Sequence, residues 1–254
     1  YSLLQGYDYL HLNQKYGVDL QIGASDQWTN ILSGVELVRR KLQKEAFALV
    51  TPLVTDANGK KFGKSEGNAV WLDPKKTSPY AFYQFWLNQP DQVTEKYLKF
   101  YTFMPVMEIE ALCEMHRRNP GRRDAQKMLA RLVTEIVHGK DAALRSIAVS
   151  EALFGERAIG SLTPEERAVV LAEAPSLKIS QTELTAGYSV IDALVASGLA
   201  TSKGEARRLL EGKGVSINDE KIESVDTELD TSHFQNSLAL LKKGKQLAVL
   251  TIEK

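Results

Sequence analysis

The chain has 254 residues, of which 43% are hydrophobic and 25% are charged, so it can form one large domain or two to three small ones. Its 32 basic residues balance its 32 acidic residues, which excludes a protein that attracts polyanions through its overall charge. The single cysteine, Cys113, excludes an internal disulfide and is typical of a reducing compartment, so we expect a cytoplasmic protein. No apolar run approaches the roughly 20 residues of a membrane helix, and no signal peptide is visible, so we expect no membrane partner.

The first segment of the chain predicts a helix followed by a strand–helix–strand unit. Residues 1–16 have helical periodicity. Their apolar stripe comprises Leu3, Leu4, Tyr7, Leu10 and Tyr16. The next residues read as a short strand at 18–23, a helix at 27–43 and a buried strand at 47–54. Such a unit implies a parallel sheet covered by helices, and therefore an α/β fold for residues 1–74.

The rest of the chain predicts a helical region, a connector and a small module of helices and strands. Residues 75–150 contain a helix start at Ser78 and Pro79, followed by aromatic side chains that we expect in a core. Further amphipathic helices are expected at 92–101, 107–118 and 122–138. Residues 151–187 contain glycine and proline breakers and read as a connector. Residues 188–254 combine two short helices with strand-like segments, as in a compact α+β module.

Three polar side chains share one face of the first predicted helix. Tyr1, Gln5 and Asp8 follow the spacing i, i+4 and i+7, which brings them to the same side. A phenol, an amide and a carboxylate in a row can line a pocket for a ligand with both donors and acceptors. The alternative is a helix face that is simply solvated.

The end of the first predicted strand carries a second polar group. Gly23 can admit a ligand against the backbone, and ligands of α/β sheets bind at the carboxyl ends of strands. Asp26 can accept hydrogen bonds from ribose hydroxyls, while Gln21 and Gln27 can reach a polar substrate. The alternative is that Asp26 only caps the helix that follows. Trp28 is expected in the core.

The stretch Lys61-Phe62-Gly63-Lys64-Ser65 indicates a nucleotide-activating enzyme. Its two lysines flank a glycine in a polar, turn-rich segment, so both ammonium groups can reach the oxygens of a polyphosphate. They can then neutralise the charge that grows when a phosphate–phosphate bond breaks. The alternative is a solvated hairpin turn.

Two basic clusters are candidates for contact with RNA. In the C-terminal module, Lys203, Arg207, Arg208 and Lys213 lie on or just after one short helix and can follow phosphates. The alternative is a surface helix laced with salt bridges, because acidic residues lie nearby. A second basic cluster is the loop with the pairs Arg117-Arg118 and Arg122-Arg123, for which a solvated loop is the alternative.

Taken in order and spacing, these motifs resemble the bacterial tyrosyl-tRNA synthetases, which are class I aminoacyl-tRNA synthetases, over essentially the whole chain. The resemblance implies that residues 1–74 are the C-terminal part of a Rossmann-like catalytic domain with the mobile signature loop of the class. It implies that residues 75–150 are an α-helical domain of the anticodon-binding type. Residues 151–187 would then be a connector, and residues 188–254 a small α+β RNA-binding domain.

The resemblance also implies roles for single residues. Tyr1 and Gln5 look like residues that hold the amino group of the substrate tyrosine, and Asp8 looks like the acceptor of its phenolic hydrogen bond. The remaining assignments are Gln21 and Gln27 to tyrosine, Gly23 and Asp26 to ATP or the adenylate, and Lys61, Lys64 and Ser65 to the catalytic loop at the phosphates.

The implied activity is that of a tyrosine–tRNA ligase. The carboxylate of tyrosine attacks the α-phosphate of ATP, pyrophosphate leaves, and the tyrosyl group passes from the adenylate to tRNA-Tyr. ATP with Mg²⁺ is a substrate of such enzymes, which need no tightly bound cofactor and no metal site of their own. The family is typically homodimeric.

The chain also departs from the family pattern. The signature His-Ile-Gly-His is absent, and Ala24 and Thr29 stand where glycines are usual. The chain begins at Tyr1 within a helical pattern, so we expect the downstream part of a longer protein that does not form tyrosyl-adenylate by itself. Two alternatives remain: a catalytically inactive RNA-binding relative, and the tryptophan-specific sister enzyme, against which Asp8 and the C-terminal module argue.

Overall fold

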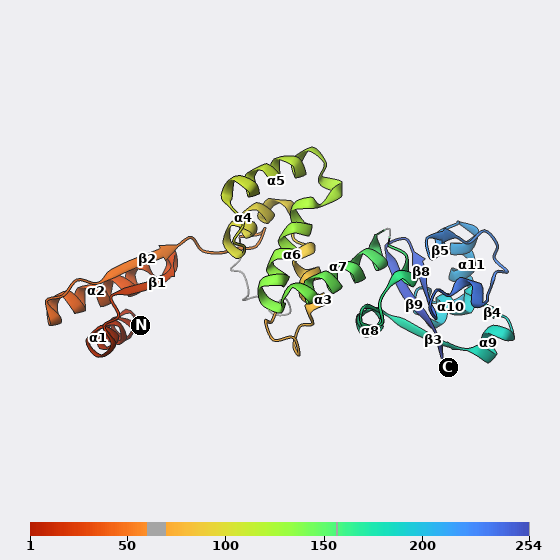
Figure 1. The fold of residues 1–254 in the computed structure, drawn as a ribbon, viewed down its shortest axis with the longest axis horizontal. Coiled ribbons are helices and arrows are strands. Elements are labelled where there is room, and N and C mark those ends of the chain that lie inside the picture. The colour runs from red at the N-terminus through yellow and green to blue at the C-terminus, as the bar shows by residue number, and fades with distance from the viewer. Residues whose placement is uncertain (60–69, 156, 254) are drawn as a thin grey trace. The chain divides into compact units, whose positions relative to one another are not determined.

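The computed structural model of the chain describes residues 1–59, 70–155 and 157–253. The chain divides into two compact units, residues 1–69 and 70–254, and the description below takes each unit separately (Figure 1). Within the described ranges, no helix combines the length and the hydropathy that crossing a membrane requires.

The first unit is the predicted helix followed by a parallel strand–helix–strand unit. Its elements are α1 (Ser2–Tyr16), β1 (Leu20–Ala24), the short 3-10 helix η1 (Ser25–Gln27), α2 (Trp28–Leu42) and β2 (Phe47–Thr51). The two strands pair in parallel, from Leu20 opposite Phe47 to Ala24 opposite Thr51. The predicted parallel arrangement is therefore confirmed, because the strand direction is preserved across the intervening helix.

Two glycines let α1 approach α2 closely. A Cβ atom added to Gly34 would lie 2.7 Å from Cδ1 of Tyr9, and one added to Gly6 would lie 2.7 Å from Oγ of Ser33. The packed face of α1 therefore consists of Gly6, Tyr9 and Asn13, which are all buried. The apolar stripe expected from periodicity is not the packed face: Leu3, Leu4, Tyr7 and Tyr16 are 64–79% exposed. At the positions of Gly6 and Gly34, bulkier side chains do not fit between the two helices.

The phenol of Tyr9 also ties α1 to both strands. Its hydroxyl oxygen lies 2.8 Å from the carbonyl oxygens of Asp19 and Phe47, which share its single hydrogen as acceptors. Burial raises the pKa of this phenol, although the hydrogen bond to Phe47 acts in the opposite direction. A buried phenol with a satisfied hydroxyl is a stable anchor between layers.

The strand expected to be buried at 47–54 is only half covered. β2 ends at Thr51, and its side chains alternate between exposed and partly buried, as do those of β1. Phe47 and Leu49 are 55% and 50% exposed, because only one face of the two-stranded sheet is covered within the described residues. The core assignment of Trp28 was also wrong: it is 44% exposed at the first turn of α2, before the buried residues of that helix begin.

The second unit opens with helices that pack around aromatic side chains. These helices are α3 (Pro79–Leu87), α4 (Asp91–Tyr101), α5 (Val106–Arg118), α6 (Asp124–His138) and α7 (Lys140–Phe154). The hydroxyl of Ser78 caps α3 by accepting from the amide of Ala81, as the sequence predicts. Trp86 stacks edge-on against Phe82 and Tyr97, with ring centroids 6.1 Å and 5.9 Å away, so the expected aromatic core is confirmed. α7 was not singled out from the sequence.

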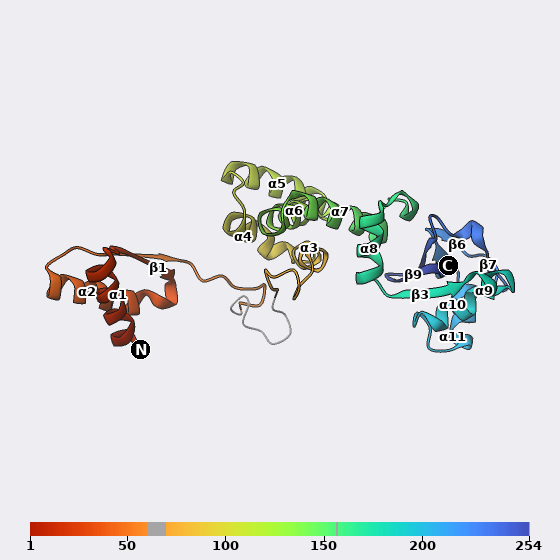
Figure 2. The same ribbon diagram turned by 60° about the horizontal axis from the view of Figure 1, so that its bottom comes forward.

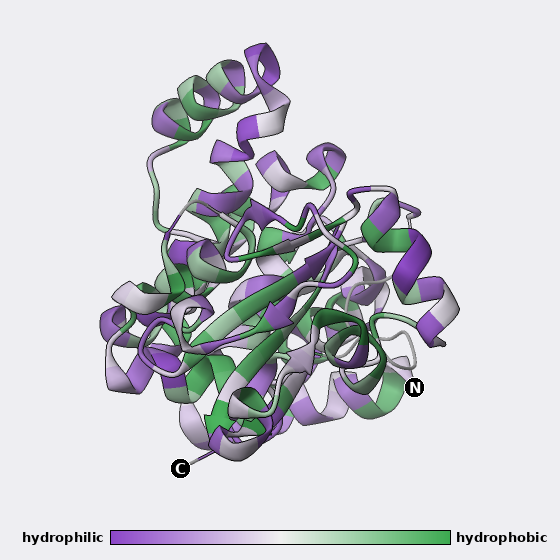
Figure 3. Cartoon of the chain, turned by 90° about the vertical axis from the view of Figure 1, so that its right-hand side faces the viewer, coloured by the Kyte–Doolittle hydropathy of each residue, from purple (hydrophilic) through white to green (hydrophobic). Residues whose placement is uncertain are grey.

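The chain then passes from α8 (Pro164–Glu173) into β3 (Ser176–Ser180), as Figure 2 shows. β3 belongs to a five-stranded sheet with the order β3-β9-β8-β5-β6. Its strands are β3 (Ser176–Ser180), β5 (Val215–Ile217), β6 (Glu220–Lys221), β8 (Leu238–Lys243) and β9 (Gln246–Glu253). Around it lie the helices α9 (Gln181–Thr185), α10 (Val190–Ala196) and α11 (Lys203–Glu211) and the strand pair β4 (Tyr188–Ser189) and β7 (Glu228–Leu229). We call residues 176–253 the small module; Figure 3 shows hydrophobic colour along its central strands. β3 pairs in parallel with β9, so part of the expected connector belongs to the sheet.

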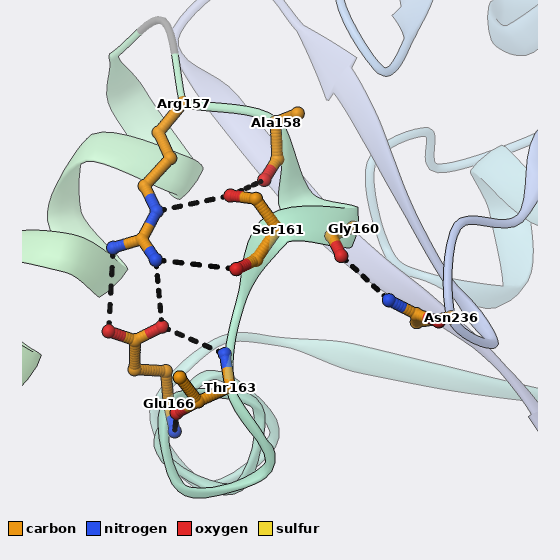
Figure 4. A network of polar contacts seen from close by, with 7 residues as sticks. All are labelled: Arg157, Ala158, Gly160, Ser161, Thr163, Glu166 and Asn236. Carbon is orange, nitrogen blue, oxygen red and sulfur yellow. Dashed lines mark hydrogen bonds and ion pairs between the residues drawn. The ribbon is translucent and has the colours of Figure 1, made fainter.

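The small module and α7 share a hydrophobic core. Leu153 of α7 belongs to the same buried cluster as Leu240 of β8 and Val249 of β9. Polar contacts surround this core (Figure 4): Asn236 donates to the carbonyl of Gly160 at 2.6 Å, and Arg157 forms an ion pair with Glu166 at 3.0 Å. The helical part and the sheet are therefore expected to unfold together.

We predict that Gly34→Ala destabilises the first unit. Overpacking against Tyr9 costs about 1–3 kcal/mol, which outweighs the gain of roughly 1 kcal/mol in helix propensity. Hydrogen exchange of the α1 and α2 amides should accelerate. Gly204→Ala in α11 is the control, because its added Cβ would meet only Oγ of Ser202 at 3.9 Å. Unchanged or slower exchange in α1 and α2 of Gly34→Ala would contradict the close crossing.

We predict that Leu153→Ala lowers the free energy of unfolding of the second unit by about 2–5 kcal/mol through the cavity it leaves. Because the core is shared, exchange protection should fall in β8 and β9 as well as in α7. Leu144→Ala is the control on the same helix, since Leu144 is 49% exposed. If the loss of protection stopped at α7, the two parts would not share one cooperative core.

Candidate active site

The carboxyl end of β1 lies directly against the start of α2. A Cβ atom added to Gly23 would lie 3.0 Å from Cβ of Gln27 and 3.1 Å from Cδ1 of Ile31. Glycine thus favours this close packing, in which the predicted residues Gly23 and Gln27 lie side by side. This edge of the sheet is where α/β proteins bind their ligands.

A chain of hydrogen bonds joins the start of α1 to the same edge. Oγ of Ser2 donates to Oδ1 of Asn30 at 2.8 Å, and Nδ2 of Asn30 donates to Oε1 of Gln27 at 3.1 Å. Oγ of Ser33 donates to the carbonyl of Ser2 at 2.7 Å. The structure therefore brings the end of α1 that carries Tyr1 next to the strand end that carries Gly23. Sequence reasoning assigned no role to Asn30; its position three residues after Gln27 at a helix start is the signal that could have found it.

The predicted stripe on α1 lies beside the packed face. Gln5 and Asp8 directly precede the buried positions Gly6 and Tyr9, and Tyr1 is the N-cap of the helix. Tyr1 is 87% exposed, Asp8 is exposed and Gln5 is half-buried. These side chains are open to solvent in the described chain, so a phenol-binding pocket around Asp8 stays a prediction.

Gln21 is the candidate residue whose side chain has a buried hydrogen-bond acceptor without a donor. Its Oε1 atom is buried and has no hydrogen-bond partner among the residues that the structure describes. Buried acceptors without a donor are rare in folded proteins, so a ligand that donates a hydrogen bond would complete this site. Asp26 lies exposed in η1, two residues after the end of β1.

The catalytic loop cannot be placed from the described residues. Lys61, Lys64 and Ser65 all fall between residues 59 and 70, outside the described ranges. Their assignment to the phosphates of ATP therefore remains a prediction.

The basic cluster of the small module lies on α11, as expected. Arg207, Arg208 and Lys213 are exposed, and no ion pair within the described ranges involves any of them. Lys203 differs, because its Nζ lies 2.6 Å from Oδ1 of Asp192. Three of the four predicted cations are thus available to phosphates, while the fourth must first leave a carboxylate.

The arginines of the loop between α5 and α6 are already engaged. Arg117 pairs with Glu95 and Glu114, Arg118 with Glu114, and Arg122 with Asp124. Arg123 donates to the carbonyl of Leu87. This pairing favours the alternative of a solvated, salt-bridged loop over a phosphate-binding one.

Comparison with known proteins assigns the chain to a family. The model of the family described as tRNA synthetases class I (W and Y) matches residues 1–155. A second model, described as the Tyrosine--tRNA ligase SYY-like C-terminal domain, matches residues 167–251. Together they cover most of the chain.

Individual relatives agree with this assignment. The chain is 47% identical over 249 residues to a tyrosine–tRNA ligase of Roseiflexus castenholzii, and 46% identical over 247 residues to one of Anaeromyxobacter dehalogenans. Each alignment covers 97% of this chain but only 58% and 59% of the relative. A solved structure, a C-terminally truncated mitochondrial tyrosyl-tRNA synthetase of Aspergillus nidulans, matches at 36% identity with a TM-score of 0.50, covering 60% of this chain and 44% of that one. The chain thus spans little more than half the length of these ligases, and it belongs to the tyrosyl-tRNA synthetase family of the class I synthetases.

Proposed function

We propose that this protein is a tyrosine–tRNA ligase, which activates tyrosine with ATP and transfers the tyrosyl group to tRNA-Tyr. The observation that carries the proposal is the contact series from Ser2 through Asn30 to Gln27, with Gly23 packed against Gln27. It joins the first turn of α1 to the carboxyl end of β1. A substrate that bridges tyrosine and nucleotide groups needs these two segments to be adjacent.

Tyrosine would be held by side chains from both segments. Tyr1 and Gln5 would bind its amino group, Gln21 and Gln27 its polar atoms, and Asp8 its phenolic hydroxyl. The buried, unpartnered Oε1 of Gln21 supports this role. Asp8 would also supply selectivity, because an amino acid without the hydroxyl leaves the carboxylate unpaired at a substantial cost.

ATP would bind at Gly23 and Asp26, with Lys61, Lys64 and Ser65 at the phosphates. The protein supplies position and charge, and the reaction needs no covalent enzyme intermediate. Mg²⁺ would arrive with ATP, held mainly through phosphate oxygens. The residues that the structure describes contain no group of three or more His, Cys, Asp or Glu side chains able to hold a metal, so we assign none of them to it.

The finer organisation is part of the same proposal. We infer a catalytic domain at 1–74, a helical anticodon-binding domain at 75–150 and an RNA-binding domain at 188–254. We also infer a homodimer that works in the cytoplasm. The match of residues 167–251 to a tyrosine-ligase C-terminal domain favours tyrosine over tryptophan as the substrate.

A second function, RNA binding without adenylate formation, fits the chain taken by itself. Tyr1 and Asp8, which would hold tyrosine, are open to solvent, whereas Arg207 and Arg208 of α11 are exposed and can contact phosphates. The two functions differ in whether the site activates an amino acid, which the following experiment measures.

We predict that the purified 254-residue chain catalyses no tyrosine-dependent exchange of pyrophosphate into ATP, because two of its proposed tyrosine-binding side chains, Tyr1 and Asp8, are open to water. A protein with the full length of the relatives should catalyse the exchange with tyrosine and not with phenylalanine. In that longer protein, the counterpart of Asp8→Ala should lower kcat/KM for tyrosine by about 10²-fold. No exchange by the longer protein would contradict the assignment to a ligase, whereas exchange by the 254-residue chain would contradict only the predicted inactivity of this chain.

We predict that α11 binds tRNA through phosphate contacts. Arg207→Ala and Lys213→Ala should each weaken binding of a tyrosine tRNA transcript and reduce the slope of log affinity against log salt by about 0.9. Lys178→Ala, which removes an exposed lysine on β3, is the matched control and should change neither. Equal slopes for all three variants would argue against an RNA-binding surface on α11.

A further inference from the structure

Lys243 connects the end of β8 to both flanks of α11. Its backbone lies opposite Val215, the residue with which the chain re-enters the sheet after α11. Its Nζ donates to Oε1 of Glu205 at 2.9 Å and to the carbonyl of Leu199 at 2.8 Å. Glu205 lies in the first turn of α11, and Leu199 lies just before it. Lys243 therefore contacts the chain both before and after this helix.

The carboxylate of Glu205 is fully engaged. Besides Lys243, it binds the residue that precedes the cap of α11: its Oε2 accepts from the amide of Thr201 at 2.8 Å and from the hydroxyl of Thr201 at 2.6 Å. These contacts, with that from Lys243 first, lower the pKa of Glu205 to about 2. At neutral pH this site is an ion pair whose side chains are only 25% and 28% exposed.

The ion pair matters because phosphates must approach α11 closely. The small module contains more acidic than basic residues, so its overall charge does not attract RNA. Glu205 stands three residues before Arg208 on the same short helix, a spacing that places both on one face. Without Lys243, an uncompensated carboxylate would remain beside the cations that are exposed to solvent, and it would repel phosphate.

We propose that Lys243 supports the RNA-binding surface of α11 without contacting RNA: held against Glu205 and the carbonyl of Leu199, its ammonium cancels the charge of Glu205. The inference rests on the proposed RNA-binding role of α11. The basic residues of the module then have two different roles. Arg207 and Lys213 are exposed and contact phosphates, whereas the Lys243 ammonium is already bound to Glu205 and to the carbonyl of Leu199.

The test measures binding of a tyrosine tRNA transcript to the 254-residue chain across a salt series. Lys243→Met should weaken binding about three- to ten-fold through its coupling to Glu205, with the salt slope unchanged. The double variant Glu205→Gln/Lys243→Met should return to within about two-fold of the parent, because no uncompensated charge is left. Lys245→Met, an exposed position on the same hairpin, is the matched control for loss of a lysine.

A direct contact between Lys243 and RNA would give a different result. The double variant would then stay weak, and the salt slope would fall by about 0.9, as for Lys213→Ala; either outcome overturns the inference, as does parent-like affinity of Lys243→Met. The double variant also decides the question if Lys243→Met alone does not fold, since it lacks both charges. If Arg207→Ala and Lys213→Ala left binding unchanged, the RNA-binding role of α11 would fail, and this inference with it.

Discussion

The close crossing of α1 over α2 is the constraint on which the candidate active site depends. Gly6 and Gly34 remove the side chains that would hold the two helices apart, and the ring of Tyr9 fills the space between them. Only at this separation can Ser2 reach Asn30, and through it Gln27. The polar residues of the site are therefore positioned by packing of small residues behind them, and not by contacts among themselves.

The second unit depends on a different kind of junction. α7 contributes Leu153 to a core that β8 and β9 complete, so the helical part and the sheet stabilise each other. Around this core, Gly160 accepts from Asn236 and donates its amide to Gln235 at 3.1 Å. An apolar centre enclosed by hydrogen bonds to backbone groups fixes orientation as well as distance. α11 packs on the opposite face of the sheet, where its Leu210 shares a buried cluster with Leu241 of β8.

Much of this fold could be predicted from local sequence patterns. The parallel strand–helix–strand unit, the Ser78 cap and the Ser202 cap of α11 all follow from spacing and propensity, and all three are present. The packing face of α1 could not be predicted this way, because hydrophobic periodicity favours large apolar residues while this helix packs through Gly6. Helix periodicity records which residues are apolar, and not how near the neighbouring backbone comes.

The residues of the candidate sites also fall into two groups: those that local sequence predicts and those that it does not. Gly23 and Gln27 follow directly from the end of a strand, and the structure brings them together. Asn30 and Lys243 were not found, because their roles depend on partners that are distant in the chain, Ser2 and Glu205. The pairing of Arg117 with Glu95 was likewise not predicted, because Glu95 lies on a neighbouring helix. Pairing across elements is the information that a linear pattern lacks.

The outer face of the β1–β2 sheet has a practical consequence. Leu20, Ile22, Phe47 and Leu49 present four large apolar side chains to water on a flat, two-stranded surface. Adhesion between such faces grows on warming, because hydrophobic attraction weakens in the cold, whereas the surface ion pairs elsewhere on the chain respond mainly to salt. Low temperature rather than high ionic strength should therefore keep concentrated solutions of this polypeptide clear.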